Sequence, residues 1–114
     1  MKKIAILSCL DACQVCTGAA CFQVWNEKRK HFSCYAEEDV SFAAFFHCNG
    51  CSKDPIEDKG MKEKLDRLQS MGVDVVHTGV CTMKDAKQNV QCPNITKVLD
   101  MLHERGIKTV HGTH

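Results

Sequence analysis

The 114-residue sequence lacks an excess charge of either sign and lacks any long apolar run. Fifteen basic and fourteen acidic residues give a formal net charge of +1, so there is no basic footprint for nucleic acid or an anionic membrane. The longest apolar runs cover residues 4–7 and 42–46, whereas a helix that crosses a bilayer needs roughly 18–20 apolar residues. We therefore expect no nucleic-acid partner and no membrane partner.

Several functional motifs are also missing. The apolar stretch after Met1-Lys2-Lys3 is shorter than the roughly 7–15-residue core of a signal peptide, so we expect a cytoplasmic location. No glycine-rich dinucleotide fingerprint follows the first apolar run, and no phosphate-binding P-loop occurs. A phosphatase-type loop needs an arginine six positions beyond Cys9, and that residue is Val15. The scattered acidic residues form no distinctive carboxylate pair, and the sequence assigns no catalytic residue.

Cysteine is the residue that the sequence has in excess, with nine copies beside six histidines. Because nine is odd, the cysteines cannot all pair within the chain. In a reducing compartment, clustered cysteines more often hold metal or perform redox chemistry than form disulfides. The sequence therefore predicts a metal or redox site, on a chain with enough periodic apolar sequence to form its own core.

Four short apolar runs alternate with amphipathic patterns. The runs, at residues 3–8, 40–46, 73–76 and 107–110, are typical of buried strands. Thr17 is expected to cap the first helix, a second starts at Asp54-Pro55 or nearer Gly60, and a third starts at Pro93. This alternation predicts a single domain over residues 1–114. Its fold would be a three-layer α/β fold, Rossmann- or flavodoxin-like, with about four mainly parallel strands and helices on both faces.

Sulfur or imidazole side chains follow each predicted strand. In chain order they are Cys9, Cys48, Cys51, His77, Cys81, His111 and His114. Because the carboxyl ends of parallel strands share one edge, we expect these side chains to converge there.

Two local patterns favour bound metal at this edge. In Cys48-Asn49-Gly50-Cys51, the two-residue gap lets both thiolates reach one ion, and Gly50 allows a tight turn. Cys92 precedes Pro93 at the start of the third predicted helix, where free amides and the helix dipole favour a thiolate. The predicted metal ligands are drawn from Cys9, Cys16, Cys48, Cys51, Cys81 and Cys92, with His114 nearby.

The other cysteines and histidines are given structural roles. Cys21 lies on the apolar face of a predicted helix and is expected in the core, and Cys34 stands alone before a strand. His31 and His103 fall on charged segments and are expected at the surface. Two residues stay open between the site and simple packing, namely Cys13 and His47.

The ordered set of these motifs resembles the CGGC-domain family of small metal-binding proteins. The matching pieces are Cys16-Thr17-Gly18-Ala19-Ala20-Cys21-Phe22, the strand that runs into Cys48-Asn49-Gly50-Cys51, Val73-Asp74-Val75-Val76-His77 with Cys81, Cys92-Pro93, and Gly106-Ile107 through Gly112-Thr113-His114. Asn49 stands in place of the first glycine of the name-giving motif, and asparagine tolerates a left-handed backbone, so we expect the loop to be preserved. The resemblance implies a metal-binding domain, commonly supposed to hold zinc.

Three functions are compatible with this pattern. The preferred one is binding of Zn²⁺ by thiolates, with or without a histidine, at the edge where the strands end. The second is an iron–sulfur cluster, because Cys9-x3-Cys13-x2-Cys16 has the spacing of radical-SAM enzymes. Those enzymes carry an aromatic residue where this chain has Val15, and their barrel needs a longer chain. The third is a thiol–disulfide oxidoreductase that uses Cys48 and Cys51.

Overall fold

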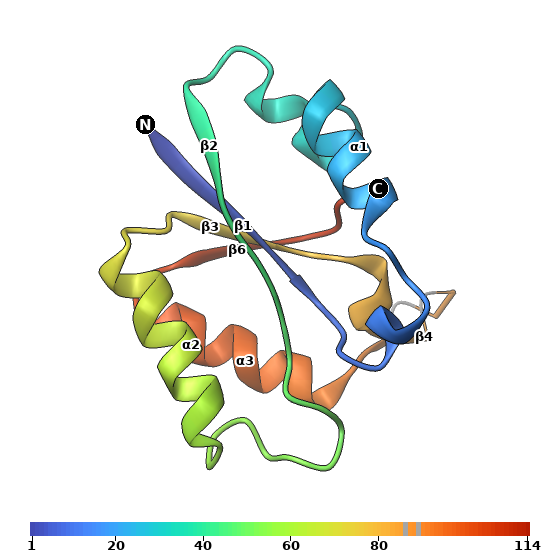
Figure 1. The fold of residues 1–114 in the computed structure, drawn as a ribbon, viewed down its shortest axis with the longest axis vertical. Coiled ribbons are helices and arrows are strands. Elements are labelled where there is room, and N and C mark those ends of the chain that lie inside the picture. The colour runs from blue at the N-terminus through green and yellow to red at the C-terminus, as the bar shows by residue number, and fades with distance from the viewer. Residues whose placement is uncertain (86, 89) are drawn as a thin grey trace.

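The computed structural model describes residues 1–85, 87–88 and 90–114 (Figure 1). Within them, a four-stranded parallel sheet is formed by β1 (Lys2–Ser8), β2 (Val40–His47), β3 (Val75–Thr78) and β6 (Lys108–His111). The α-helices are α1 (Ala19–Glu27), α2 (Lys59–Ser70) and α3 (Pro93–Glu104). Short 3-10 helices are η1 (Ala12–Gln14), η2 (Lys30–Tyr35) and η3 (Val80–Thr82), and β4 (Met83–Asp85) pairs antiparallel with β5 (Val90–Gln91).

The strand order in the sheet is β2-β1-β3-β6, which confirms the expected parallel α/β topology. The chain moves from β1 to β2 on one side, then returns to place β3 on the other side of β1. This order matches the first four strands of a flavodoxin-like sheet, whose ligands bind outside the carboxyl ends at the point where the order reverses. In this chain, that point lies between the ends of β1 and β3.

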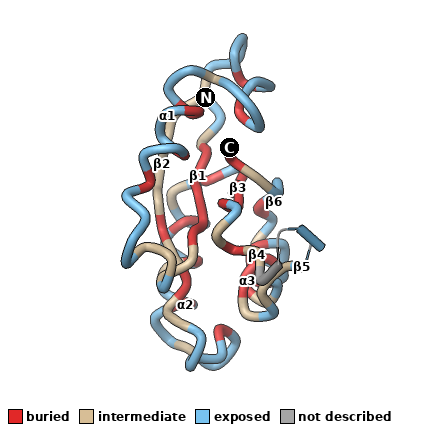
Figure 2. The backbone as a smooth tube through the Cα atoms, turned by 90° about the vertical axis from the view of Figure 1, so that its right-hand side faces the viewer, coloured by how far each residue is buried: buried red, intermediate tan, exposed pale blue. Residues whose placement is uncertain are grey.

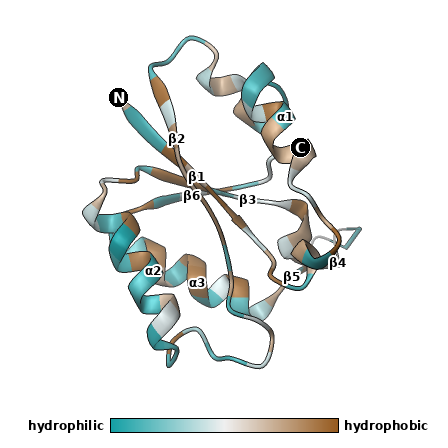
Figure 3. Ribbon diagram, in the orientation of Figure 1, coloured by the Kyte–Doolittle hydropathy of each residue, from teal (hydrophilic) through white to brown (hydrophobic). Residues whose placement is uncertain are grey.

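Helices cover both faces of the sheet (Figure 1). Ile4 and Ile6 of β1 belong to a core with α1 and η2, whereas Ala5 and Leu7 belong to a core with α2 and α3. This alternation follows from the two-residue period of a strand and makes β1 buried on both sides (Figure 2). Hydrophobic and hydrophilic residues alternate along α2 and α3, as expected for helices with one packed face (Figure 3).

The predicted helices agree with the structure best at α3, which begins at Pro93. The N-cap of α1 is Gly18 rather than Thr17, although the Thr17 hydroxyl accepts a hydrogen bond from Ala19 N at 3.2 Å. Of the two starts considered for α2, the later one is confirmed: Asp58 caps the helix by accepting from Gly60 N at 3.0 Å. Asp54 instead closes a turn before the helix. No helix in the described part of the chain is long and apolar enough to span a membrane.

Candidate metal site

A pocket of about 410 Å³ opens at the carboxyl ends of the strands, and we call it the sulfur pocket. Its lining residues are Cys9, Cys51, Cys81, Met83, Cys92, Pro93 and Asn94. The four cysteines come from four separate segments: the loops after β1 and β2, the 3-10 helix after β3, and the residue that precedes α3. Thiols from distant parts of the chain therefore lie around one pocket at the edge where the strands end, in agreement with the expected convergence.

Cys9 and Cys81 meet where the strand order reverses. The backbone N–H of Cys9 donates a hydrogen bond to Cys81 Sγ at 3.4 Å. Gly79 N donates to Leu7 O at 3.0 Å, which fixes the start of η3 against the end of β1. Burial raises the pKa of the Cys81 thiol, and the Cys9 amide opposes that rise by stabilising the thiolate. A cation in the pocket would add the positive charge that a buried thiolate lacks.

Cys51 lies on the exposed side of the sulfur pocket. Its Sγ donates a hydrogen bond to Asp11 Oδ2 at 3.2 Å. This hydrogen bond and the negative charge of Asp11 raise the pKa of the Cys51 thiol. The Cys51 thiol is therefore held in its protonated form, and the carboxylate of Asp11 lies beside it.

Cys92 is the N-cap residue of α3 and closes the pocket on that side. Its carbonyl accepts from Thr96 N at 3.0 Å, and its own N–H donates to Thr82 O at 3.1 Å. Asn94, in the first turn of α3, donates from Nδ2 to the carbonyl oxygen of Cys51 at 3.3 Å. The backbone around Cys92 is therefore tied both to η3 and to the loop that carries Cys51.

Cysteine thiolates are the preferred ligands of Zn²⁺ and of iron–sulfur clusters, so the donor chemistry of the sulfur pocket fits the expected metal. In residues 1–85, 87–88 and 90–114, no group of three or more His, Cys, Asp or Glu side chains is arranged as a metal site. A Zn–S bond is about 2.3 Å long, so ligation requires the pocket thiols to draw together around the ion.

The family model of the CGGC domain matches residues 3–114. The chain belongs to the CGGC domain family. Comparisons with curated proteins and with solved structures found no match. Membership of this cysteine-rich family, which is associated with metal binding, agrees with the gathering of thiols at the sheet edge.

In the motif that names the CGGC family, this chain has Asn49 in place of the first glycine, and the left-handed backbone given as the reason for tolerating asparagine there is wrong. Among the described residues other than glycine, positive φ occurs at Lys28 and Lys30, so Asn49 is not left-handed. Gly50 is, with φ 105°. The Asn49 side chain instead donates to Asp58 Oδ2 at 2.8 Å and accepts from Lys64 Nζ at 2.6 Å. The Asn49 side chain therefore connects the motif to the N-cap and the first half of α2 by hydrogen bonds.

Cys48 and Cys51 of the motif point to different surroundings. Cys48 is 6% exposed and packs in the core with α2 and α3, and its Sγ accepts from Leu10 N at 3.4 Å. Cys51 lines the sulfur pocket, and Cys48 is not part of that lining. The two thiols of the motif therefore differ in burial, and of the two, Cys51 lines the sulfur pocket.

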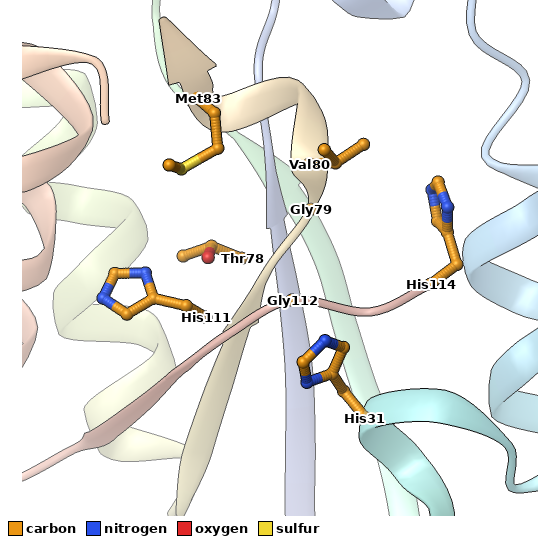
Figure 4. Close-up of a pocket in the computed structure, with 8 residues that line it drawn as sticks. All are labelled: His31, Thr78, Gly79, Val80, Met83, His111, Gly112 and His114. Atoms are coloured by element: carbon orange, nitrogen blue, oxygen red, sulfur yellow. The ribbon is translucent and has the colours of Figure 1, made fainter. Parts of the chain in front are cut away.

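Cys16 and His114, two further predicted ligands, lie outside the sulfur pocket. Cys16 is exposed, and its Sγ accepts from Gly18 N at 3.3 Å just before α1. His114 lies with His31 and His111 along a separate pocket of about 190 Å³, where Gly112 passes between the rings (Figure 4). A side chain at Gly112 would collide with the ring of His31, so that ring packs directly on the backbone.

The prediction that His77 faces the sheet edge is wrong. Its ring is fully buried on the α1 side of the sheet, where Nε2 accepts from the Tyr35 hydroxyl at 2.7 Å and Nδ1 donates to Gly112 O at 3.0 Å. The ring centroid lies 4.6 Å from that of Phe32. Burial lowers the pKa of His77, so the imidazole is neutral and packs as part of the core.

The remaining cysteines and histidines largely follow their predicted roles. Cys21 is buried in the core with α1, and its Sγ lies 3.2 Å from Thr113 Oγ1. Cys34 is exposed and its Sγ contacts the carbonyl of His31 at 3.6 Å, away from the sulfur pocket. His31 and His103 are exposed, as expected. The two residues left open are placed near the edge: Cys13 Sγ is 3.4 Å from Ser8 Oγ, and His47 Nδ1 is 3.3 Å from Cys48 O.

Proposed function

We propose that the protein binds Zn²⁺ through cysteine thiolates in the sulfur pocket. The observation that carries this proposal is that Cys9, Cys51, Cys81 and Cys92 line one pocket at the reversal of strand order. Four thiolates complete a tetrahedral zinc site, the arrangement typical of structural zinc. Membership of the CGGC family supports the same reading.

The environment of these thiols favours metal binding over simple packing. A packed cysteine is surrounded by apolar neighbours, whereas Cys51 is exposed and the other three pocket cysteines are partly exposed around an open space. The pKa values of Cys51 and Cys81 are raised, so these thiols give up their protons when a cation takes the proton's place. Metal binding at this pocket therefore releases protons and becomes stronger as pH rises.

An ion in the sulfur pocket would also stabilise the fold. Its ligands come from segments that are far apart in the sequence and converge only in the folded chain. A ligand that binds only the folded state, at a thousand times its dissociation constant, adds about 4 kcal/mol to the free energy of unfolding. Cys16, Cys48 and His114 stay predictions as ligands, since each lies outside this pocket.

An iron–sulfur cluster is the second candidate, because four cysteines are also the full ligand set of a [4Fe–4S] cluster and the pocket is open. Thiol–disulfide exchange by the Cys48–Cys51 pair is less well supported. Cys48 is buried, and Asp11 raises the pKa of Cys51, whereas an attacking thiol needs to be accessible and to have a stabilised thiolate.

Metal analysis of reconstituted protein tests the proposal. Reduced protein, purified without oxygen, is loaded separately with Zn²⁺ and with iron and sulfide, and bound metal is counted by inductively coupled plasma spectrometry. Cys92→Ser is the informative variant because serine is itself a good N-cap, so α3 is retained while one thiol is lost. Cys34→Ser is the matched control, a cysteine replaced outside the pocket.

We expect at least one Zn²⁺ per chain in the parent protein and in Cys34→Ser. In Cys92→Ser, zinc affinity should fall by more than about 100-fold, because even an outer-shell partner of a metal ligand contributes about 10–100-fold. Zinc well below one per chain, or equal affinity in all three proteins, would refute the proposal. A brown protein that retains iron but not zinc would favour the cluster instead.

A further inference from the structure

The pocket beside the end of β6 contains imidazole and hydroxyl groups that the proposed zinc site does not use, and we call it the histidine pocket. Its volume is about 190 Å³, and its polar side chains are His31, Thr78, His111 and His114 (Figure 4). It lies at the carboxyl ends of β3 and β6, on the edge where parallel α/β sheets bind their ligands. Met83 lines both this pocket and the sulfur pocket, so the two are neighbours.

Thr78, at the end of β3, contributes a hydroxyl that the rest of the described fold does not use. The residue is 2% exposed, and its hydroxyl has no hydrogen-bond partner among the described residues, whereas the Thr82 hydroxyl donates to Gly79 O at 2.7 Å. No side-chain polar atom in the described part of the chain is both enclosed and unpaired, so the Thr78 hydroxyl reaches the open space of the pocket (Figure 4). A largely buried hydroxyl of this kind is available to a bound ligand.

His111 of β6 lies opposite Thr78 in the register of the sheet. Side chains at one register position of adjacent strands share a face, and the strands lie about 4.8 Å apart, so the imidazole stands next to the hydroxyl. Gln91 Nε2 donates to His111 Nδ1 at 3.3 Å, and Gln91 Oε1 accepts from Thr96 Oγ1 at 3.3 Å. These hydrogen bonds place the imidazole proton of His111 on Nε2, which is left to donate to a ligand.

The His31 ring forms a further wall of the histidine pocket, on the other side of Gly112 (Figure 4). A Cβ atom at Gly112 would collide with this ring, and the φ of 110° at Gly112 also favours glycine. The turn before His31 contains Lys28 and Lys30, whose φ angles are 53° and 52°. Positive φ is uncommon for residues other than glycine and clusters at functional sites. An unfavourable backbone conformation therefore directly precedes the imidazole of this wall.

The chemistry of the histidine pocket suits a small anion. Its described lining contains no carboxylate side chain, and its imidazoles and hydroxyl all carry hydrogens that they can donate. Residues 28–30 add two lysines and an arginine near His31, where Glu27 is the ion-pair partner of Arg29. A net positive surface raises the local concentration of anions. Within the described ranges, the histidines are not arranged as a metal site.

The size of the histidine pocket limits the anion. Pockets that enclose drug-sized ligands have volumes of roughly 300–1,000 Å³. A volume of about 190 Å³ is therefore enough for a small ion, or for the terminal group of a larger molecule.

We propose that the histidine pocket binds a phosphate group, with the Thr78 hydroxyl and the His111 imidazole as its principal donors. The phosphate can be a free ion or the end of a phosphate monoester. Binding forms hydrogen bonds and breaks no covalent bond. The site is independent of zinc in the sulfur pocket, because Met83 is the one described residue that lines both pockets.

Isothermal titration calorimetry of the reduced full-length chain with inorganic phosphate tests this site. Phenyl phosphate is the probe for a monoester, and glycerol is a small neutral probe that carries hydroxyl groups but no charge. We expect phosphate or phenyl phosphate to bind and glycerol not to bind. Tighter binding of phenyl phosphate would identify a monoester as the ligand, whereas tighter binding of phosphate would identify the free ion, and both results support the site.

Two variants separate this pocket from any metal ion that could itself bind phosphate. Thr78→Val keeps the shape of the side chain and removes the hydroxyl, and His111→Phe keeps a planar ring and removes its donor. Each should weaken phosphate binding by at least about 10-fold, the usual contribution of a hydrogen bond to a charged group. Thr109→Val is the matched control, because its hydroxyl contacts His103 outside the pocket.

Thr78→Val should also melt no lower than the parent protein, since its hydroxyl has no partner to lose among the described residues. If His111→Phe does not fold, Thr78→Val still decides the question. Absence of phosphate binding in the parent protein, equal binding of glycerol, or unchanged affinity in Thr78→Val would overturn the proposal. Each of these results would leave the proposed zinc site intact, since its thiols line the other pocket.

Discussion

Replacing His77 by glutamine should remove a specific part of the pH dependence of stability. The imidazole is fully buried between η2 and the end of β6, where it accepts from Tyr35 and donates to Gly112 O. Desolvation lowers the pKa of His77 in the folded protein, the backbone bond to Gly112 partly opposes this, and the nearby His31 lowers the pKa slightly further. Burial raises the pKa of the Tyr35 hydroxyl, so it stays protonated and can donate to Nε2.

The sign of the effect follows from linkage. In the unfolded chain, His77 takes up a proton near pH 6.5, whereas the folded chain resists protonation. The stabilising contribution is therefore complete above about pH 6.5 and is lost as pH falls toward the lowered folded pKa. In that pH window, His77 alone lowers the free energy of unfolding by up to about 1.4 kcal/mol for each unit by which the pH falls.

Urea unfolding of the reduced, metal-free protein between about pH 5 and 8 measures this dependence. A chelator should be present at every pH, because metal binding is coupled to proton release and would otherwise change how the free energy of unfolding depends on pH. His77→Gln is expected to be less stable at pH 8, since a buried hydrogen-bonded ring is lost, and to show a shallower decline below pH 6.5. His103→Gln is the control, an exposed histidine that contacts Thr109.

Parallel declines for the parent protein and His77→Gln would refute the buried neutral imidazole. If the stability of His103→Gln also fell less steeply below pH 6.5, surface histidines rather than His77 would account for the pH dependence.

Four further outcomes are expected. Asn49→Gly restores the glycine of the family motif but removes two side-chain hydrogen bonds to α2, so urea unfolding should show a loss of about 1–2 kcal/mol; an unchanged midpoint would contradict this. Leu65→Ala should cost about 2–5 kcal/mol by the same assay, against about 0.5 kcal/mol or less for the exposed Glu63→Ala. Zinc affinity, measured by chelator competition, should increase from pH 6 to 8 because the pKa values of Cys51 and Cys81 are raised; a flat profile would argue against these ligands. Removing zinc with a chelator should lower the melting temperature, whereas an unchanged melting curve would place the ion outside the folded core.

The sheet and α3 could be predicted because their signals are local. The buried run after Lys3 and the Pro93 start need no information about distant residues. The start of α2 was ambiguous because Asp54 and Asp58 both suit a cap, and only the turn before Asp58 decides between them. η2 has no counterpart among the predictions, since a six-residue 3-10 helix with buried Phe32 and Tyr35 lacks a long periodic pattern.

At the candidate site, the rule that strand ends converge agrees with the position of Cys9, Cys51, Cys81 and Cys92 around one pocket, while their role as metal ligands stays a prediction. The rule concerns backbone position and does not determine side-chain direction. Cys48 lies at the same edge as Cys51 yet turns into the core. The direction of His77 depended on the register of β3, which the sequence pattern places only to within a residue or two, so a ring expected at the edge lies inside.

The two walls of the sulfur pocket differ in how they are anchored. Cys9 follows β1, an inner strand of the sheet whose residues 4–7 are completely buried, and its backbone N–H donates a hydrogen bond to Cys81 Sγ. Cys51, by contrast, projects from an exposed loop. An ion bound in the sulfur pocket would thus be held on one side by segments anchored to the buried sheet and on the other side by a loop at the surface. Exchange of such an ion with other thiol carriers would accordingly be controlled by the loop that carries Cys51.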